Sequence, residues 1–157
     1  MSVKRQLDAP PIIEVVCGIF YAPIPAIDPV SVGALWERLR ETYPTHAIHP
    51  AISDGLPFVV LPGRLRSWFV SRDDVYVVQI QADRFYVNWR KRADLYPRFS
   101  DREGKEGVLA RALREFDVFA EDCERRLGQR PRPATVELSK VDLLVQGEHW
   151  TDLADLV

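Results

Sequence analysis

The segment from Ser67 to Arg90 constrains the fold more than any other part of the chain. Three runs rich in β-branched and aromatic residues, SWFVS, VYVVQIQ and FYVNWR, follow one another with only residues 72–74 and 82–84 between them. Such runs are typical of β-strands, and connections this short allow only antiparallel neighbours. We therefore expect a three-stranded antiparallel meander at the centre of the fold.

The last strand of this meander predicts which side of the sheet is buried. Successive strand residues point to opposite faces, so Phe85, Val87 and Trp89 share one apolar face. We expect this face to pack into the core against two helices. The helix residues expected to meet it are Leu35, Trp36 and Leu39 on one helix and Leu113 and Phe116 on the other.

A strand and a helix are predicted before the meander. The run IIEVVCGIFY, Ile12 to Tyr21, is typical of a strand. Asp28 is suited to cap a helix whose first residue is Pro29. The apolar stripe of that helix comprises Val32, Leu35, Trp36, Leu39 and Tyr43, and Pro44 marks its end. The prolines and glycines of Thr45–Gly63 predict a long surface loop, in which only FVVL resembles a short edge strand.

A second helix and a last strand are predicted after the meander. Ser100 and Glu103 have capping-box spacing, so we expect a helix that opens at Ser100 and ends before Gly128. Its apolar stripe comprises Leu109, Ala112, Leu113, Phe116, Ala120, Cys123 and Leu127. The run TVELSKVDLLV predicts a final strand, and TDLADLV resembles the start of another helix.

The order of these elements, β-α-β-β-β-α-β, predicts the α+β class. We expect a mostly antiparallel sheet with two amphipathic helices packed on one face. A chain of 157 residues is long enough for a single domain with its own core. We expect one domain over residues 1–157, ordered over about residues 9–145, with 146–157 as the start of a truncated or missing second half.

Composition argues against several functional classes. Lys and Arg number 21 and Asp and Glu 23, a net charge of −2, so nucleic-acid binding would need a local basic patch. No apolar run reaches the length of a membrane span, and the first residues lack a secretory signal. Cys17 and Cys123 fit no disulfide framework or zinc motif and read as buried small hydrophobes. We expect a cytoplasmic protein that does not contact a membrane.

Catalytic and metal-binding motifs are not evident in the sequence. It contains no G-x-S-x-G, P-loop or G-x-G-x-x-G motif. His46 and His49 form only a pair, whereas a metal site needs at least a third ligand. We therefore expect no metal and no cofactor. An enzyme with an unrecognised site, built from scattered carboxylates or histidines, stays an alternative.

The mixed face of the meander is the candidate binding surface. Its polar and aromatic residues, of kinds that anchor protein interfaces, are Gln79, Gln81, Tyr86, Asn88 and Arg90. This face favours a protein partner or a homo-oligomer. The alternative is nucleic-acid binding through a basic segment with interleaved aromatic residues. Its residues are Arg84, Arg90, Lys91, Arg92 and Arg98, although the segment lacks the glycine that RNA-binding strands place between their aromatics.

Four blocks of the sequence also resemble a known family. In order they are APPIIEVVCGIFYAP, ETYP, VVQIQADRFYVNWRK and YPRF, and they span roughly residues 9–140. Together they resemble a sporadically distributed, functionally uncharacterised family of bacterial proteins. The resemblance implies an α+β fold and an accessory bacterial system, such as an antitoxin-like, immunity or phage-defence component. Members of that family continue into a second half, whereas this chain ends soon after VELSKVDLLV.

Overall fold

The computed structural model describes residues 10–52, 60–92, 97–100 and 106–156. Within them, strands and helices follow in the order β1 (Ile12–Tyr21), α1 (Pro29–Leu39), β2 (Thr45–Ile52), β3 (Val60–Val70), β4 (Tyr76–Gln81), β5 (Arg84–Arg90), α2 (Val108–Leu127) and β6 (Pro133–Asp142). The six strands form one sheet in the order β2-β3-β4-β5-β1-β6, and every neighbouring pair is antiparallel. The predicted meander is therefore confirmed as β3-β4-β5.

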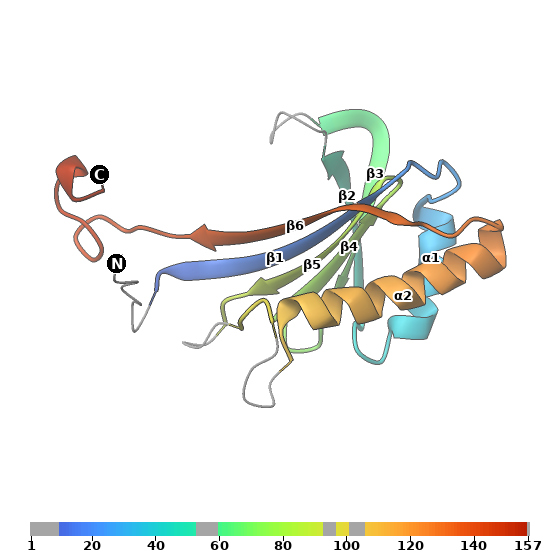
Figure 1. Cartoon of the computed structure of the whole chain (residues 1–157), viewed down its shortest axis with the longest axis horizontal. Coiled ribbons are helices and arrows are strands. Elements are labelled where there is room, and N and C mark those ends of the chain that lie inside the picture. The colour runs from blue at the N-terminus through green and yellow to red at the C-terminus, as the bar shows by residue number, and fades with distance from the viewer. Residues whose placement is uncertain (1–9, 53–59, 93–96, 101–105, 157) are drawn as a thin grey trace.

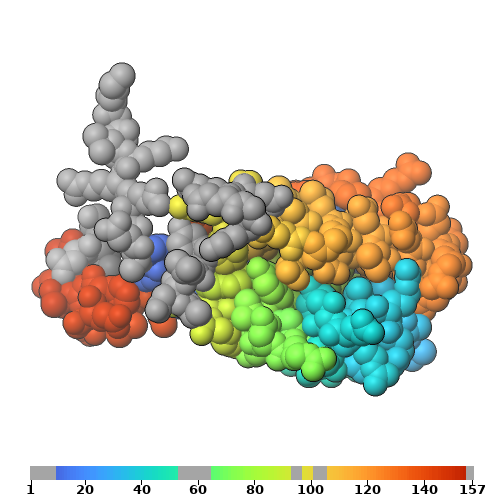
Figure 2. Space-filling model, turned by 90° about the horizontal axis from the view of Figure 1, so that it is seen from below, coloured from blue at the N-terminus to red at the C-terminus, as the bar shows by residue number. Residues whose placement is uncertain are grey.

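Both helices cover the same face of the sheet, as expected for the α+β class (Figure 1). Helix α2 runs across β5 and β1, and α1 lies against β3. Viewed from the helix side, α1 and α2 lie next to each other over the sheet (Figure 2). Neither helix in the described part of the chain has the length and hydropathy needed to cross a bilayer.

The core lies between the sheet and the helices, and it contains the apolar face predicted for β5. Phe85 and Val87 are fully buried, and Trp89 is nearly so. The ring of Phe85 lies 5.6 Å from that of Phe116 and 5.3 Å from that of Phe119, centroid to centroid. These rings join β5 to α2, so burial of this strand face fixes its register in the sheet.

The predicted role of Leu113 was wrong, because this side chain is 45% exposed. Residues 112, 116, 119, 120 and 123 of α2 are buried and follow the helical spacing of three and four. Leu113 lies one residue, or about 100° of helix rotation, beyond Ala112 and therefore faces solvent. Phe119 takes the place that the sequence analysis gave to Leu113.

Helix α1 begins as predicted, with a reciprocal cap. The Asp28 carboxylate accepts a 2.8 Å hydrogen bond from the Ser31 N–H, and the Ser31 hydroxyl accepts a 3.0 Å bond from the Asp28 N–H. The helix ends at Leu39, so Tyr43 is not on its stripe. Tyr43 is nevertheless fully buried, because the chain turns back after Leu39 and Trp36 donates to the Tyr43 carbonyl at 2.8 Å.

Helix α2 does not open at Ser100; its first residue is Val108 and its cap position is Gly107. The N–H groups of Val108 and Leu109 donate to the carbonyls of Arg98 and Phe99, at 3.0 and 2.9 Å. Backbone carbonyls therefore accept the hydrogen bonds of the first helical N–H groups, a role that the sequence assigned to the Ser100 and Glu103 side chains. Glu103 lies outside the described residues. A β-carbon at Gly107 would lie 2.5 Å from the Ser100 carbonyl carbon, so this close approach requires glycine.

The predicted surface loop Thr45–Gly63 instead contains β2 and the first residues of β3, with residues 53–59 outside the described part. β2 pairs with β3 from Thr45 opposite Val70 to Pro50 opposite Leu65. As an edge strand it needs hydrogen bonds on one side only, so it tolerates Pro50. The FVVL prediction falls partly on undescribed residues, and its last two residues belong to β3.

The C-terminal part leaves the sheet after β6, which is the predicted last strand. Residues beyond Asp142 extend past the end of the sheet and turn back on themselves (Figure 1). The expected start of another α-helix is a short 3₁₀ helix, Leu153–Leu156. In this view the C-terminal segment lies at the opposite end of the molecule from the C-terminus of α2.

Candidate functional site

The predicted binding residues do lie on the sheet face away from the helices, but most of them are buried. Gln79, Gln81 and Asn88 are each no more than 7% exposed. Only Tyr86 and Arg90 keep intermediate exposure. The mixed face is therefore not the open polar surface that strand alternation suggested. Alternation predicts which side a residue faces, and it does not predict what the neighbouring strands place beside it.

Gln79 and Asn88 belong to a chain of polar side chains that crosses four strands. Arg66 on β3 donates to the Gln79 amide oxygen at 2.7 Å. The Gln79 amide donates to Asn88 on β5 at 2.8 Å, and the Asn88 amide donates to Glu14 on β1 at 2.7 Å. Because each amide both donates and accepts, the buried amides of Gln79 and Asn88 find hydrogen-bond partners within this chain. We name these four residues the polar ladder.

Gln81 ties the β4–β5 turn to the end of β2. Its amide oxygen accepts from the Ile52 N–H at 3.2 Å, and its amide nitrogen donates to the Ile52 carbonyl at 3.1 Å. The same nitrogen donates to Asp83 at 3.0 Å. A glutamine that replaces strand-like backbone bonds in this way fixes the position of β2. Its role here is structural.

The basic segment proposed for nucleic-acid binding is largely paired with carboxylates. Arg84 is 4% exposed and makes two hydrogen bonds, of 3.0 and 2.8 Å, with Asp83. Arg90 and Arg92 both form ion pairs with Asp74 in the β3–β4 turn. Lys91 is exposed and Arg98 is half-buried. Arg84, Arg90 and Arg92 therefore have carboxylate partners within the fold, which weakens any positive field at this place.

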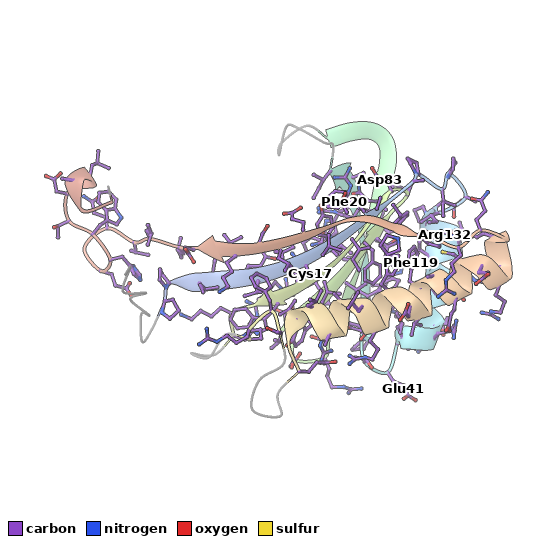
Figure 3. The ribbon with its side chains drawn as sticks, viewed as in Figure 1. Cys17, Phe20, Glu41, Asp83, Phe119 and Arg132 are labelled. Atoms are coloured by element: carbon purple, nitrogen blue, oxygen red, sulfur yellow. The ribbon has the colours of Figure 1, made fainter. Side chains whose placement is uncertain are left out.

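Burial and ion pairing have opposite effects on the pKa of Asp83. Burial raises it, but hydrogen bonds from Arg84 and Gln81 outweigh that effect, so the pKa lies below its ordinary value. Asp83 is therefore ionised at neutral pH and neutralises the buried Arg84 guanidinium, which also lies 5.1 Å from the centre of the Phe20 ring. The Asp83–Arg84 pair is a structural element of the β4–β5 turn. Figure 3 labels Asp83 and Phe20.

The two histidines of β2 lie on opposite faces of the sheet. His46 lies opposite Phe69 and contacts the rings of Phe69 and Trp36 on the helix side. His49 lies on the other side, 4.2 Å from the ring of Trp68. Residues three apart in a strand point in opposite directions, so these side chains cannot share one metal ion. Burial lowers the pKa of His46.

The two cysteines are buried in the core as predicted. Burial raises the pKa of Cys17 to about 11, and the nearby Glu137 carboxylate adds to the effect. Burial likewise raises the pKa of Cys123 to about 12. Neither thiol has the lowered pKa of a reactive nucleophile. Cys17 lies on β1, on the sheet face that α2 covers (Figure 3).

A run of exposed apolar side chains lies on β6 and on the residues that follow it, a surface that the sequence did not indicate. β6 stands at one edge of the sheet and, in the described part of the chain, pairs only with β1. Val136 and Leu138 point to the helix side but are 46% and 44% exposed. Further exposed apolar side chains follow: Val141, Leu143, Leu144 and Val145. Alternation predicted the strand, but not its edge position, which depends on pairing with the distant β1.

The open edge of β6 also presents backbone hydrogen-bonding groups. Lys91 donates to the Ile13 carbonyl, and Tyr21 donates to the Asp83 carbonyl, so odd-numbered residues of β1 face β5. Even-numbered residues of β1 therefore face β6, and they lie opposite residues 135, 137 and 139. The intervening Val136 and Leu138 consequently direct their N–H and C=O groups to the open edge. Such an edge is a template for a further strand.

Comparison of the chain with protein-family models, with curated proteins and with solved structures gives no match.

Proposed function

We propose that this protein is a non-catalytic protein-interaction module and that it binds its partner by strand addition to β6. The observation that carries the proposal is the open β6 edge, where outward backbone groups coincide with the exposed side chains of Val136 and Leu138. Strand addition obtains affinity from main-chain hydrogen bonds and specificity from alternate side chains. β6 offers both over a length of ten residues.

This surface differs from the one that the sequence favoured. On the mixed face of β4 and β5, Gln79 and Asn88 hydrogen-bond within the polar ladder. Of the residues predicted there, only Tyr86 and Arg90 are partly accessible to a partner. In contrast, nine of the ten residues of β6 are exposed. We therefore place the main contact on β6 and give the mixed face a secondary role at most.

The proposal extends to the cellular setting. The resemblance to a sporadically distributed bacterial family favours an accessory system, such as an antitoxin-like, immunity or phage-defence component. Two buried free thiols suit a reducing compartment, so we propose a cytoplasmic location. Nucleic-acid binding is the weaker candidate, because the carboxylates of Asp83 and Asp74 engage Arg84, Arg90 and Arg92.

Affinity purification of the tagged protein from a bacterial host, followed by mass spectrometry, tests the proposal. We expect a stoichiometric protein partner with the wild-type chain and none with Leu138→Pro. The Leu138 N–H faces the open edge, so proline there removes an outward donor and leaves the β1–β6 bonds in place. Circular dichroism should show the same fold for both proteins.

Two results would contradict the proposal. One is recovery of the wild-type chain alone and monomeric under gentle conditions. The other is a partner that Leu138→Pro retains at full stoichiometry, which would remove the β6 edge from the contact. A steeply salt-dependent affinity for nucleic acid, lost on substitution of Lys91 and Arg98, would favour the alternative instead.

A further inference from the structure

We infer that the strand added to β6 is β6 of a second copy of this chain, antiparallel and related by a two-fold axis at Leu138. The inference rests on the proposed function, because it names the partner that the open edge takes. Two six-stranded sheets would then join into one continuous antiparallel sheet, with both pairs of helices on the same side.

The first step concerns the faces of the two sheets. A two-fold axis between antiparallel strands stands perpendicular to the sheet, so each face of one copy continues into the same face of the other. Residues therefore pair only with residues of the same side. On the helix side these are Val136, Leu138 and Lys140, which lie opposite Ile19, Cys17 and Val15 in β1.

The second step selects the register. An axis at Glu137 would oppose two carboxylates, and an axis at Lys140 would oppose two ammonium groups, which destabilises cross-strand pairs. An axis at Ser139 would place Leu138 opposite Lys140 of the second copy. An axis at Leu138 opposes the two leucine side chains and places Glu137 opposite Ser139. Among the axes from Glu137 to Lys140, only the axis at Leu138 pairs exposed apolar side chains without opposing like charges.

The outward backbone groups agree with this register. Leu138 directs its N–H and C=O to the open edge, so Leu138 and its copy would exchange both hydrogen bonds as a directly opposed pair. Val136 would lie opposite Lys140 of the second copy, where the aliphatic part of the lysine can cover it. Each copy thus covers Val136 and Leu138 of the other copy, whose side chains are 46% and 44% exposed in the single chain.

The third step is charge complementarity beyond the paired strands. Residues 142–156 contain four acidic residues and no lysine or arginine: Asp142, Glu148, Asp152 and Asp155. The segment 125–132 contains four arginines and no acidic residue: Arg125, Arg126, Arg130 and Arg132. Arg125 and Arg126 contact Asp122, and Arg130 contacts Glu124, whereas Arg132 is exposed and directly precedes β6 (Figure 3).

In the Leu138 register, these segments meet. Antiparallel pairing places residue 142 of the second copy opposite residue 134 of the first, so the acidic segment that follows runs toward Arg132 and Arg130. The two segments lie at opposite ends of the single chain, as Figure 1 shows, and only an antiparallel copy brings them together. The contact occurs twice because of the symmetry. Charge, register and exposed surface therefore favour a second copy over an unrelated strand.

Cysteine substitution along β6 tests the register in the full-length protein. Leu138→Cys should form a disulfide-linked dimer under mild oxidation, because directly opposed residues have Cα atoms about 5.5 Å apart, within disulfide reach. Val136→Cys alone should not, because its copy lies four residues along the strand, about 13 Å away. A mixture of Val136→Cys and Lys140→Cys should form the mixed dimer. Because Cys17 and Cys123 are buried, the wild-type protein should form no disulfide-linked dimer and serves as the control.

A proline pair tests the dimer without cross-linking. Leu138→Pro should be monomeric by light scattering and keep the wild-type circular dichroism spectrum, since its N–H faces the open edge. Ser139→Pro should lower the melting temperature, because the Ser139 N–H faces β1. Arg132→Glu should raise the dimer Kd about two- to five-fold, as expected for an exposed charge pair, and the effect should shrink in high salt.

Efficient cross-linking at Glu137→Cys or Ser139→Cys in place of Leu138→Cys would overturn the inferred register. A monomeric wild-type protein at high concentration would overturn the dimer itself. A monomer that still loses a different protein partner on Leu138→Pro would leave the proposed function standing and reject the second copy. The two proposals therefore fail separately.

Discussion

The ring of Tyr86 on β5 occupies the space beside the Cα atom of Gly18, its cross-strand partner on β1. A β-carbon at residue 18 would lie 2.8 Å from Cδ1 of Tyr86 and closer still to Cε1. Phe20 meets the same ring edge-on, with centroids 5.8 Å apart. Glycine is needed here because the tyrosine ring fills the place of a side chain.

Gly18→Ala should destabilise the fold, because the new methyl group pushes the Tyr86 ring from its position. We expect a loss of about 1–3 kcal/mol in the free energy of unfolding, measured by chemical denaturation. The same substitution in a Tyr86→Ala background should cost much less, which a double-mutant cycle would record as a coupling energy. Equal costs in both backgrounds would disprove the steric explanation.

Trp89→Ala should cost about 3–5 kcal/mol, as expected for the deletion of a buried aromatic side chain. Its neighbour Arg90 lies on the other face and is 24% exposed in its side chain. Arg90→Ala should therefore change the free energy of unfolding far less, by about 1 kcal/mol at most. Urea denaturation of both variants checks the face assignment of β5, and a reversed order of the two costs would refute it.

Asn88→Ala should destabilise the protein even in the absence of any partner. It removes the acceptor of Gln79 and the donor to Glu14, so two polar groups of the ladder lose a bond. We expect a cost of about 1–3 kcal/mol in thermal or urea denaturation. Lys91→Ala, an exposed change nearby, should stay within about 0.5 kcal/mol. An unaltered stability for Asn88→Ala would return this residue to the candidate partner-binding surface.

Asp122→Asn should weaken the contact between α1 and α2. The carboxylate is 1% exposed and pairs with Arg38 on α1 as well as with Arg125 and Arg126 on α2. We expect a loss on the order of 1–3 kcal/mol at neutral pH. Asp117→Asn, an exposed change on the same helix, should be within about 0.5 kcal/mol of wild type.

The cost of Asp122→Asn should depend on pH. Burial raises the Asp122 pKa, but hydrogen bonds from Arg126, Arg125 and Arg38 outweigh it, so the folded pKa lies below the ordinary value of 3.8. A carboxyl group whose pKa is lowered by folding contributes its full stabilisation above pH 3.8. This stabilisation is lost as the pH falls through the pKa of the group in the folded protein. Denaturation curves should therefore converge below pH 3.8. A constant difference down to acid unfolding would refute this linkage.

Both cysteines should be unreactive in the folded protein at pH 8. Their pKa values, raised by burial to about 11 and about 12, leave almost no thiolate for attack. A disulfide reagent such as Ellman's should titrate neither thiol in buffer and both in guanidinium. Rapid modification of either thiol in the native state would contradict its burial.

The elements that could be predicted from the sequence are those whose signals are local. Asp28, Pro29 and Ser31 carry the start of α1 within four residues, and the structure contains that start as predicted. The start of α2 depends on the carbonyls of Arg98 and Phe99, which reach the helix only after the preceding chain has folded onto it. No local pattern reports a backbone cap of this kind, so the Ser100 spacing was misleading.

The candidate site shows the same division. Alternation placed Gln79 and Asn88 on the correct side of the sheet, but Arg66 and Glu14, which complete the ladder, come from two other strands. Likewise the run around Leu138 was recognisable as a strand, whereas its edge position follows from pairing with β1, more than a hundred residues earlier. Pairing between strands so far apart in the sequence depends on the packing of the whole core.

Pro50 on β2 limits how far the proposed β6–β6 dimer could grow by adding further copies. Ser71 donates to Tyr76, so Val70 faces β2, and by alternation Pro50 turns its nitrogen outward at the far edge of the sheet. Proline has no hydrogen to offer there, which discourages a further strand. The sheet therefore has one edge that can accept a further strand, β6, and one edge that disfavours it, β2. In the proposed dimer both copies use their β6 edges, so the assembly stops at two copies and does not continue into a fibre.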